Sequence, residues 1–185
     1  MARLQYIEKA DVPAEHHDLM KRDMTLYKQL IHSPGALRAF QGLGYYIRHA
    51  SKLDPRLREL AILQVGWLAR SSYEWSHHIK IGYDFGVSDQ DIEGLIADSA
   101  SKPSKLEPLA RLVLRAAREE TMDGAISKST FAELQTSLDN EQLVDLVVAI
   151  GFYNAVIRIL ATLEIDVEPE YQRYLEKYPF PKGGA

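Results

Sequence analysis

Glutamate and histidine side chains fall on helix faces that should otherwise be apolar, and together they could carry out acid–base chemistry. Glu74 and His78 are four residues apart in the segment 70–86, so a helix there places both on the face that holds its clearest apolar residues. Glu59 lies among leucine, isoleucine and valine in the preceding helical segment. Desolvated carboxylates and imidazoles have displaced pKa values, as proton transfer near neutral pH requires. We therefore predict that His78, Glu59 and Glu74 are catalytic.

A second group of residues is predicted to bind a substrate or to line its site: Arg158, Asn154, Trp75, Tyr73, Ser71 and His77. Arg158 and Asn154 are four residues apart in one apolar helical segment, where a guanidinium could hold a carboxylate in bidentate fashion. Trp75 could form an apolar wall, and the hydroxyl of Tyr73 could donate a hydrogen bond. His77 falls at the margin of the buried face, so we expect it at a boundary or a subunit contact.

Two alternatives to acid–base catalysis remain open. Glu59 or Glu74 could form a structural ion pair with Arg158, although two carboxylates, an imidazole, an arginine and an asparagine exceed what one ion pair requires. Glu59, Glu74 and His78 could instead bind a divalent cation. The sequence has no second well-placed histidine and no His-Glu-x-x-His motif, so we predict neither a metal nor another cofactor.

The composition excludes several classes of chemistry. The chain has 185 residues and no cysteine, which excludes disulfides, thiolate nucleophiles, cysteine-based zinc sites and dithiol redox reactions. Its net charge of −4 has the wrong sign for a domain that binds nucleic acid through the phosphates. No signal-peptide pattern is present, and the most apolar stretch is interrupted by Asp145, Asn154 and Arg158. We expect a cytoplasmic protein that acts on a small molecule and binds neither nucleic acid nor a membrane.

Apolar residues recur at helical spacing along nearly the whole chain, and alternating strand patterns are absent, which predicts an all-α fold. Helices are expected over 13–31, 34–50, 55–70, 72–85, 88–97, 106–121, 128–137 and 141–164. The face opposite Glu74 and His78 is expected to carry Tyr73, Ser76, Lys80 and Asp84. The expected N-caps are Asp54, Ser88 with Asp91 at the third helical position, and Asp139 or Asn140. We divide the chain into a helical N-terminal extension (1–33), a single helical domain (34–166) and an extended proline-rich arm (167–185) that packs on the body or on a neighbour.

Four stretches of the sequence resemble the carboxymuconolactone decarboxylase family, which shares its all-helical fold with the alkylhydroperoxidase D-like (AhpD-like) proteins. They are RELAIL from Arg58, YEWSHH from Tyr73, GVSD from Gly86 and LVDLVVAIGFYNA from Leu143. The resemblance implies a small homo-oligomer, a trimer or a hexamer, with active sites near subunit contacts. In the peroxidase branch, the motif is Glu followed by Cys-x-x-Cys-x-x-x-His. The glutamate and the histidine fall on Glu59 and His78, but the cysteines fall on Ser71 and Glu74, so the resemblance excludes thiol peroxidase activity.

The remaining branch implies a decarboxylase or another lyase that needs neither a thiol nor a cofactor. Its substrate would be a small carboxylated lactone or a related oxygenated acid. In the mechanism that we expect, His78 is oriented by Glu59 or Glu74 and delivers a proton, while Arg158 holds a substrate carboxylate. A metal-dependent hydrolase or isomerase and a non-catalytic oligomeric binding protein remain as alternatives, and the identity of the substrate stays open.

Overall fold

The computed structural model describes residues 2–181 and contains no strand in that range. The all-α fold is therefore confirmed. Three short 3-10 helices cover Lys9–Asp11, Ala14–Leu19 and Pro169–Tyr171. The α-helices in chain order are α1 (Thr25–Leu30), α2 (Pro34–His49), α3 (Pro55–Leu68), α4 (Ser72–Asp84), α5 (Asp89–Ser99), α6 (Pro108–Met122), α7 (Lys128–Leu134), α8 (Asn140–Leu163) and α9 (Gln172–Lys177).

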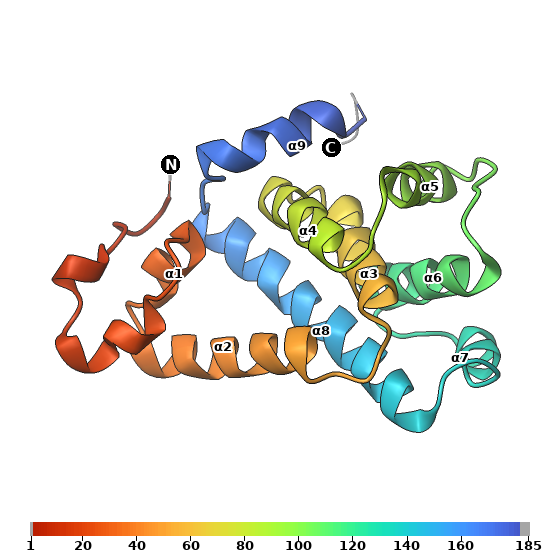
Figure 1. Ribbon diagram of the computed structural model, residues 1–185, viewed down its shortest axis with the longest axis horizontal. Coiled ribbons are helices and arrows are strands. Elements are labelled where there is room, and N and C mark those ends of the chain that lie inside the picture. Colours follow the sequence, from red (N-terminus) through yellow and green to blue (C-terminus); the bar gives the residue numbers. More distant parts are fainter. Residues whose placement is uncertain (1, 182–185) are drawn as a thin grey trace.

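Helix α3 is the centre of the fold, because every residue from Leu57 to Trp67 is buried. It packs against α4, α6 and α8, and α8 runs obliquely through the middle of the molecule (Figure 1). By length and composition alone α8 could cross a membrane, a property that the core helices of soluble proteins share. Here it packs against α2, α3 and α6. A helix buried on all sides is apolar nearly all round, so the buried polar groups of α3 stand out.

Side-chain caps start the helices where the sequence predicts. Asp54 accepts a hydrogen bond from the Leu57 backbone N–H, and Pro55 occupies the first helical position. Ser88 with Asp91 and Asp139 with Gln142 each form a reciprocal capping box. These contacts confirm the three predicted helix starts, with Asp139 rather than Asn140 as the cap of α8.

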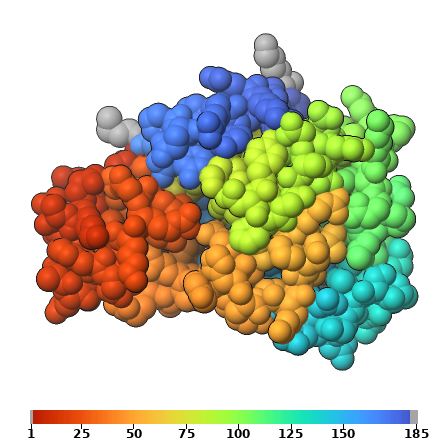
Figure 2. All heavy atoms as spheres, viewed as in Figure 1, coloured from red at the N-terminus to blue at the C-terminus, as the bar shows by residue number. Residues whose placement is uncertain are grey.

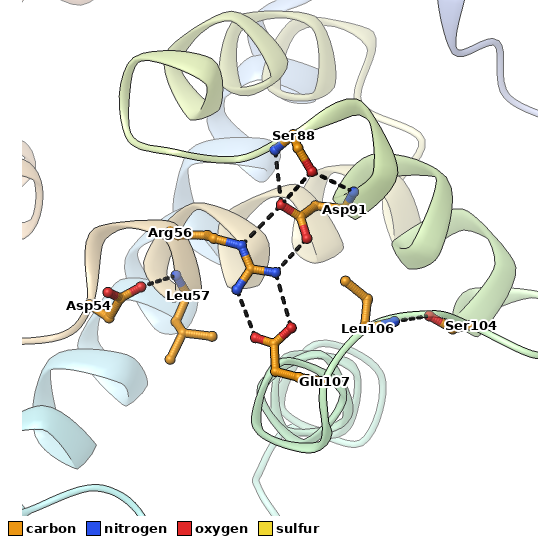
Figure 3. Close-up of polar contacts among 8 residues, drawn as sticks. All are labelled: Asp54, Arg56, Leu57, Ser88, Asp91, Ser104, Leu106 and Glu107. Atoms are coloured by element: carbon orange, nitrogen blue, oxygen red, sulfur yellow. Dashed lines mark hydrogen bonds and ion pairs between the residues drawn. The ribbon is translucent and has the colours of Figure 1, made fainter.

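One arginine joins three of the helices. Arg56 in α3 donates from Nε to Asp91 Oδ2 at 3.0 Å and from Nη1 to Glu107 Oε1 at 2.7 Å, and Nη2 also contacts both carboxylates (Figure 3). Asp91 is the capping-box residue of α5, and Glu107 immediately precedes α6. The cluster therefore fixes α5 and the start of α6 against α3.

The two ends of the chain differ from the prediction. The expected helix over 13–31 is divided into the 3-10 helix Ala14–Leu19 and the short helix α1, because the segment bends so that Leu19, Met20 and Ile31 form a small apolar cluster with Leu37 of α2. The C-terminal arm is not extended: its 3-10 helix and α9 pack against α4, which confirms packing on the body. The last part of the predicted arm, 182–185, lies outside the described residues, as does residue 1 of the N-terminal extension.

Candidate active site

The three residues predicted to be catalytic form one hydrogen-bonded row. Nδ1 of His78 lies 2.7 Å from Oε2 of Glu59, and Nε2 of the same ring lies 2.9 Å from Oε1 of Glu74. Glu59, Glu74 and His78 are 1%, 3% and 3% exposed, so the row is almost completely shielded from bulk water. A histidine between two carboxylates can hold a proton and pass it to either side.

Arg58 fixes the outer oxygen of Glu59. Its Nε and Nη2 donate to Glu59 Oε1 at 3.1 and 2.9 Å, and the guanidinium lies 4.5 Å from the centre of the Phe85 ring. Both oxygens of Glu59 are therefore occupied, one by Arg58 and one by His78. The predicted alternative of an ion pair with Arg158 is wrong for Glu59, because the neighbouring arginine of the same helix takes that role.

The charges in the row favour an ionised pair. Burial raises the pKa of Glu59, but the attraction of His78 and Arg58 outweighs burial and brings that pKa below its ordinary value. Burial lowers the pKa of His78, but Glu59 and Glu74 outweigh it and hold the pKa above its ordinary value. The imidazole is therefore protonated at a pH where a free histidine is neutral.

A cavity of about 350 Å³ lies beside this row. Glu74 and His78 line it, together with Arg48 and Tyr153 from α2 and α8, whereas Glu59 lies behind His78 and does not reach it. Other walls come from the N-terminal segment, including Arg22. The N-terminal segment, α2, α4 and the C-terminal segment meet on the face shown in Figure 2. A cavity of this size fits a small organic molecule.

His77 and Tyr73 are buried in a second polar cluster rather than lying at a boundary. The His77 ring stacks between Tyr73 and Tyr171, with ring centres 3.9 and 3.7 Å away, and its Nε2 lies 3.0 Å from Oε2 of Glu168. Both His77 and Tyr73 line the cavity. Tyr73 and Ser76, expected on the face opposite Glu74 and His78, are buried as well because the C-terminal segment packs against α4.

Trp75 and Ser71 have other roles than the predicted ones. Trp75 is fully buried, donates from Nε1 to the Tyr178 carbonyl at 2.9 Å and packs against Trp67 and Phe180, so it anchors the C-terminal segment and does not line the cavity beside His78. The Ser71 side chain caps α4 by accepting a hydrogen bond from the Glu74 backbone N–H. Ser71 lines a second, different cavity. Neither side chain forms part of the cavity wall beside His78.

Arg158 and Asn154 lie in a second cavity of about 530 Å³, not with His78. Arg158 donates to the backbone carbonyl and to Oδ1 of Asn154, and Asn154 donates to Thr121 Oγ1 at 3.0 Å. The prediction that they bind the substrate of His78 is not supported, because successive residues of α8 point about 100° apart. Tyr153 and Val156 face the first cavity, whereas Asn154 and Arg158 face the second.

The sequence prediction missed Arg48, Tyr153 and Arg58. Arg58 is adjacent to Glu59 inside an apolar helix, which is a signal that could have identified it. Tyr153 immediately precedes Asn154 and was hidden among the apolar residues of α8. Arg48 ends an amphipathic helix where arginine is common, so only the packing of α2 against α8 shows that it reaches the cavity.

The geometry gives the metal alternative little support. Each ring nitrogen of His78 already faces a carboxylate, whereas a coordinating nitrogen must present its lone pair to the metal. Across residues 2–181, no group of three or more histidine, aspartate and glutamate side chains is arranged to hold a metal ion.

Comparison with known proteins agrees with this architecture. Residues 34–120 match the carboxymuconolactone decarboxylase family. The search of curated proteins gave no significant match. Among solved structures, a peroxidase-related protein with an AhpD core from Ralstonia eutropha is 18% identical with a TM-score of 0.78, over 94% of this chain and 95% of that one.

Two further structures share the fold. A debrominase in complex with 2,3,4-tribromopyrrole is 16% identical with a TM-score of 0.79, over 96% of this chain and 99% of that one. A peroxidase-related protein from a Silicibacter species is 19% identical with a TM-score of 0.75, over 92% of this chain and 93% of that one. At these identities the likeness concerns the fold, and the family match is confined to residues 34–120. Residues 34–120 are therefore similar to the carboxymuconolactone decarboxylase family, and the chain shares the fold of the AhpD-like proteins in a form without cysteine.

Proposed function

We propose that this protein is a cofactor-independent lyase, a decarboxylase of the carboxymuconolactone type that acts on a small carboxylated lactone or a related oxygenated acid. The observation that carries the proposal is the buried row of Glu59, His78 and Glu74, which opens on a cavity of small-molecule size. General acid–base catalysis needs a proton donor held in place beside the substrate.

The proposed reaction uses this row as the proton source. The bond between the substrate carboxylate and the ring carbon breaks, and carbon dioxide leaves. The electron pair passes into conjugation with the lactone carbonyl and gives a dienolate. The dienolate then takes a proton at carbon from the His78–Glu74 pair, and solvent restores that proton. Glu59, held by Arg58, keeps the imidazole oriented and charged.

The wider family leaves other reactions to be tested. Structures with the same fold include a debrominase and peroxidase-related proteins, but any reaction that needs a cysteine is closed to a chain without one. A metal-dependent hydrolase or isomerase would lose activity to a chelator. A non-catalytic binding protein would bind carboxylated lactones and turn none of them over.

The deciding experiment is an assay of carboxylated lactones in D2O. We expect release of carbon dioxide and incorporation of one deuterium at carbon in the product. His78→Gln should lower kcat by about 10²–10⁴-fold, the usual contribution of a general acid, while circular dichroism shows an intact fold. His32→Gln, at an exposed histidine that contacts the Gln5 carbonyl, is the matched control and should keep full activity. Full activity of His78→Gln would sink the assignment.

We also propose that the active protein is a homo-oligomer, a trimer or a hexamer, and that it is cytoplasmic. The support for the oligomer is a set of exposed apolar residues on α2 and α8, two helices that pack against each other: Leu43, Tyr46, Val144 and Val147. Val144 is 61% exposed, which is unusual for valine on a long apolar helix. Light scattering of the purified protein measures the state directly, and Val144→Glu should shift it toward the monomer.

A further inference from the structure

Arg48 is a partly buried cation with no carboxylate at ion-pair distance among residues 2–181, although the charge of Glu59 and the side chain of Tyr153 act on it from nearby. Its Nε is fully shielded from solvent and has no hydrogen-bond partner among residues 2–181. No ion pair of Arg48 is found in that part of the chain, whereas Arg38, Arg56 and Arg58 each pair with a carboxylate. A buried donor without an acceptor costs free energy of folding. Arg48 is therefore placed to bind an anion from outside the chain.

The surroundings of Arg48 favour a negatively charged occupant. Lys21 and Arg22 also line the cavity, and no ion pair is found for either within the described residues. The acidic side chains of the same wall are already engaged, Asp18 by Arg38 at 2.7 Å and Glu74 by His78 at 2.9 Å. The protein as a whole is acidic, with a net charge of −4. This cavity therefore concentrates positive charge on an acidic molecule.

Tyr153 places a hydroxyl between this cation and the catalytic row. Its ring meets His78 edge-on, with ring centres 4.7 Å apart, and its side chain interacts with Arg48. Burial raises the pKa of Tyr153 well above its ordinary value, so its hydroxyl remains a neutral donor. Because the Arg48 guanidinium and the Tyr153 phenol interact and line the same cavity, both can donate to one carboxylate bound there.

We propose that Arg48 and Tyr153 form the anion-binding subsite of this cavity and that its ligand is a small organic carboxylate. The carboxylate would accept from Arg48 and from the Tyr153 hydroxyl, with the rest of the ligand directed toward Glu74 and His78. This inference rests on the proposed function for the identity of the site, and it moves the carboxylate-binding role from Arg158 on α8 to Arg48 on α2.

Binding of benzoate and of its uncharged isostere benzamide tests the subsite without turnover. Calorimetry on the full chain should show benzoate binding at least about tenfold more tightly than benzamide, the effect of one charge-assisted hydrogen bond. Arg48→Met should remove this preference, and Arg48→Lys should retain part of it. Arg158→Met, at the arginine of the second cavity, should bind benzoate as the unaltered protein does.

The outcomes separate this inference from the proposed reaction. His78→Gln should lower kcat as stated above and keep the preference for benzoate, so a loss of lyase activity leaves the subsite testable. Equal affinity for benzoate and benzamide in the unaltered protein overturns the proposal even if Arg48→Met fails to fold. A folded Arg48→Met variant could bind benzoate fully while Lys21→Met or Arg22→Met loses binding. That result would place the anion beside Lys21 and Arg22 and would also overturn the proposal.

Discussion

Oε2 of Glu59 in α3 lies 2.7 Å from Nδ1 of His78 in α4, so one hydrogen bond joins two helices at the centre of the site. The two helices approach closely because Gly66 faces α4. A Cβ placed on Gly66 would lie 3.2 Å from the backbone nitrogen of Trp75 and 3.5 Å from Cβ of Glu74. The position of the carboxylate relative to the imidazole therefore depends on a glycine that takes no part in the chemistry.

Gly66→Ala should lower both stability and activity. The methyl group would push α3 and α4 apart by a few tenths of an ångström and lengthen the hydrogen bond between Glu59 and His78. We expect a loss of roughly 1–3 kcal/mol in the free energy of unfolding and a lower kcat. Gly42→Ala is the matched control, because nothing lies within 4 Å of its added Cβ. It should raise stability by up to about 1 kcal/mol, as alanine does in a helix, and urea unfolding measures both.

Glu59→Gln should move the pH dependence of catalysis. Glu59 and Glu74 together hold the pKa of His78 above its ordinary value, and the variant removes one of these two charges. The alkaline limb of kcat/KM, where His78 loses its proton, should therefore shift to lower pH. Glu133→Gln removes a charge that pairs with Arg115 instead and should leave the profile unchanged. An unshifted limb in Glu59→Gln would show that another group titrates there.

The same pair should give the protein a defined pH range of greatest stability. The raised pKa of His78 stabilises the fold fully below about pH 6.5, and this contribution is lost as the pH rises through the folded-state pKa. The lowered pKa of Glu59 stabilises the fold above about pH 4.5, and this contribution is lost as the pH falls through its folded-state pKa. Both contributions are complete only between about pH 4.5 and 6.5. Urea unfolding at a series of pH values should show a maximum in the free energy of unfolding over this range. Glu59→Gln should flatten that maximum.

Arg56→Met should weaken the fold and spare the chemistry. Arg56 is partly buried and holds two carboxylates, Asp91 of α5 and Glu107 at the start of α6 (Figure 3), and none of these three residues lines the cavity beside His78. Its loss should cost about 1–3 kcal/mol in the free energy of unfolding, with kcat unchanged. Arg38→Met breaks the exposed pair with Asp18 and should cost much less, because solvent screens an exposed ion pair. Similar losses in the two variants would contradict the role that we give to Arg56.

The residues that could be predicted from the sequence lie on helices whose buried surface is unambiguous, either because one face alone is apolar or because the whole helix is. Glu74 and His78 share a face with the apolar residues of α4, and Glu59 lies in a helix that is buried all round, so periodicity alone places them inside. Arg158 lies in the second cavity and not beside His78, which the sequence does not reveal because α8 is apolar on several faces. Its periodicity does not say which face meets which neighbour.

Arg48 could not be predicted for a different reason. A basic residue at the end of an amphipathic helix usually lies in solvent, and nothing local to α2 indicates otherwise. Its burial depends on the bend of residues 20–24 and on the packing of α2 against α8. Tertiary contacts of this kind connect residues about 100 positions apart, as the hydrogen bond from Tyr46 to Asp145 illustrates.

Glu168 accepts hydrogen bonds from the backbone and the hydroxyl of Thr25 and pairs with His77, so both ends of the chain close on the wall of the cavity. The segment shared with the family, 34–120, contains Glu59, Glu74 and His78, but Thr25 and Glu168 lie outside it. The Glu59–His78–Glu74 row and the contacts by which the chain ends close on the cavity wall are thus encoded in separable parts of the gene. Changes at the two ends could alter which molecule enters while the same chemistry is inherited unchanged.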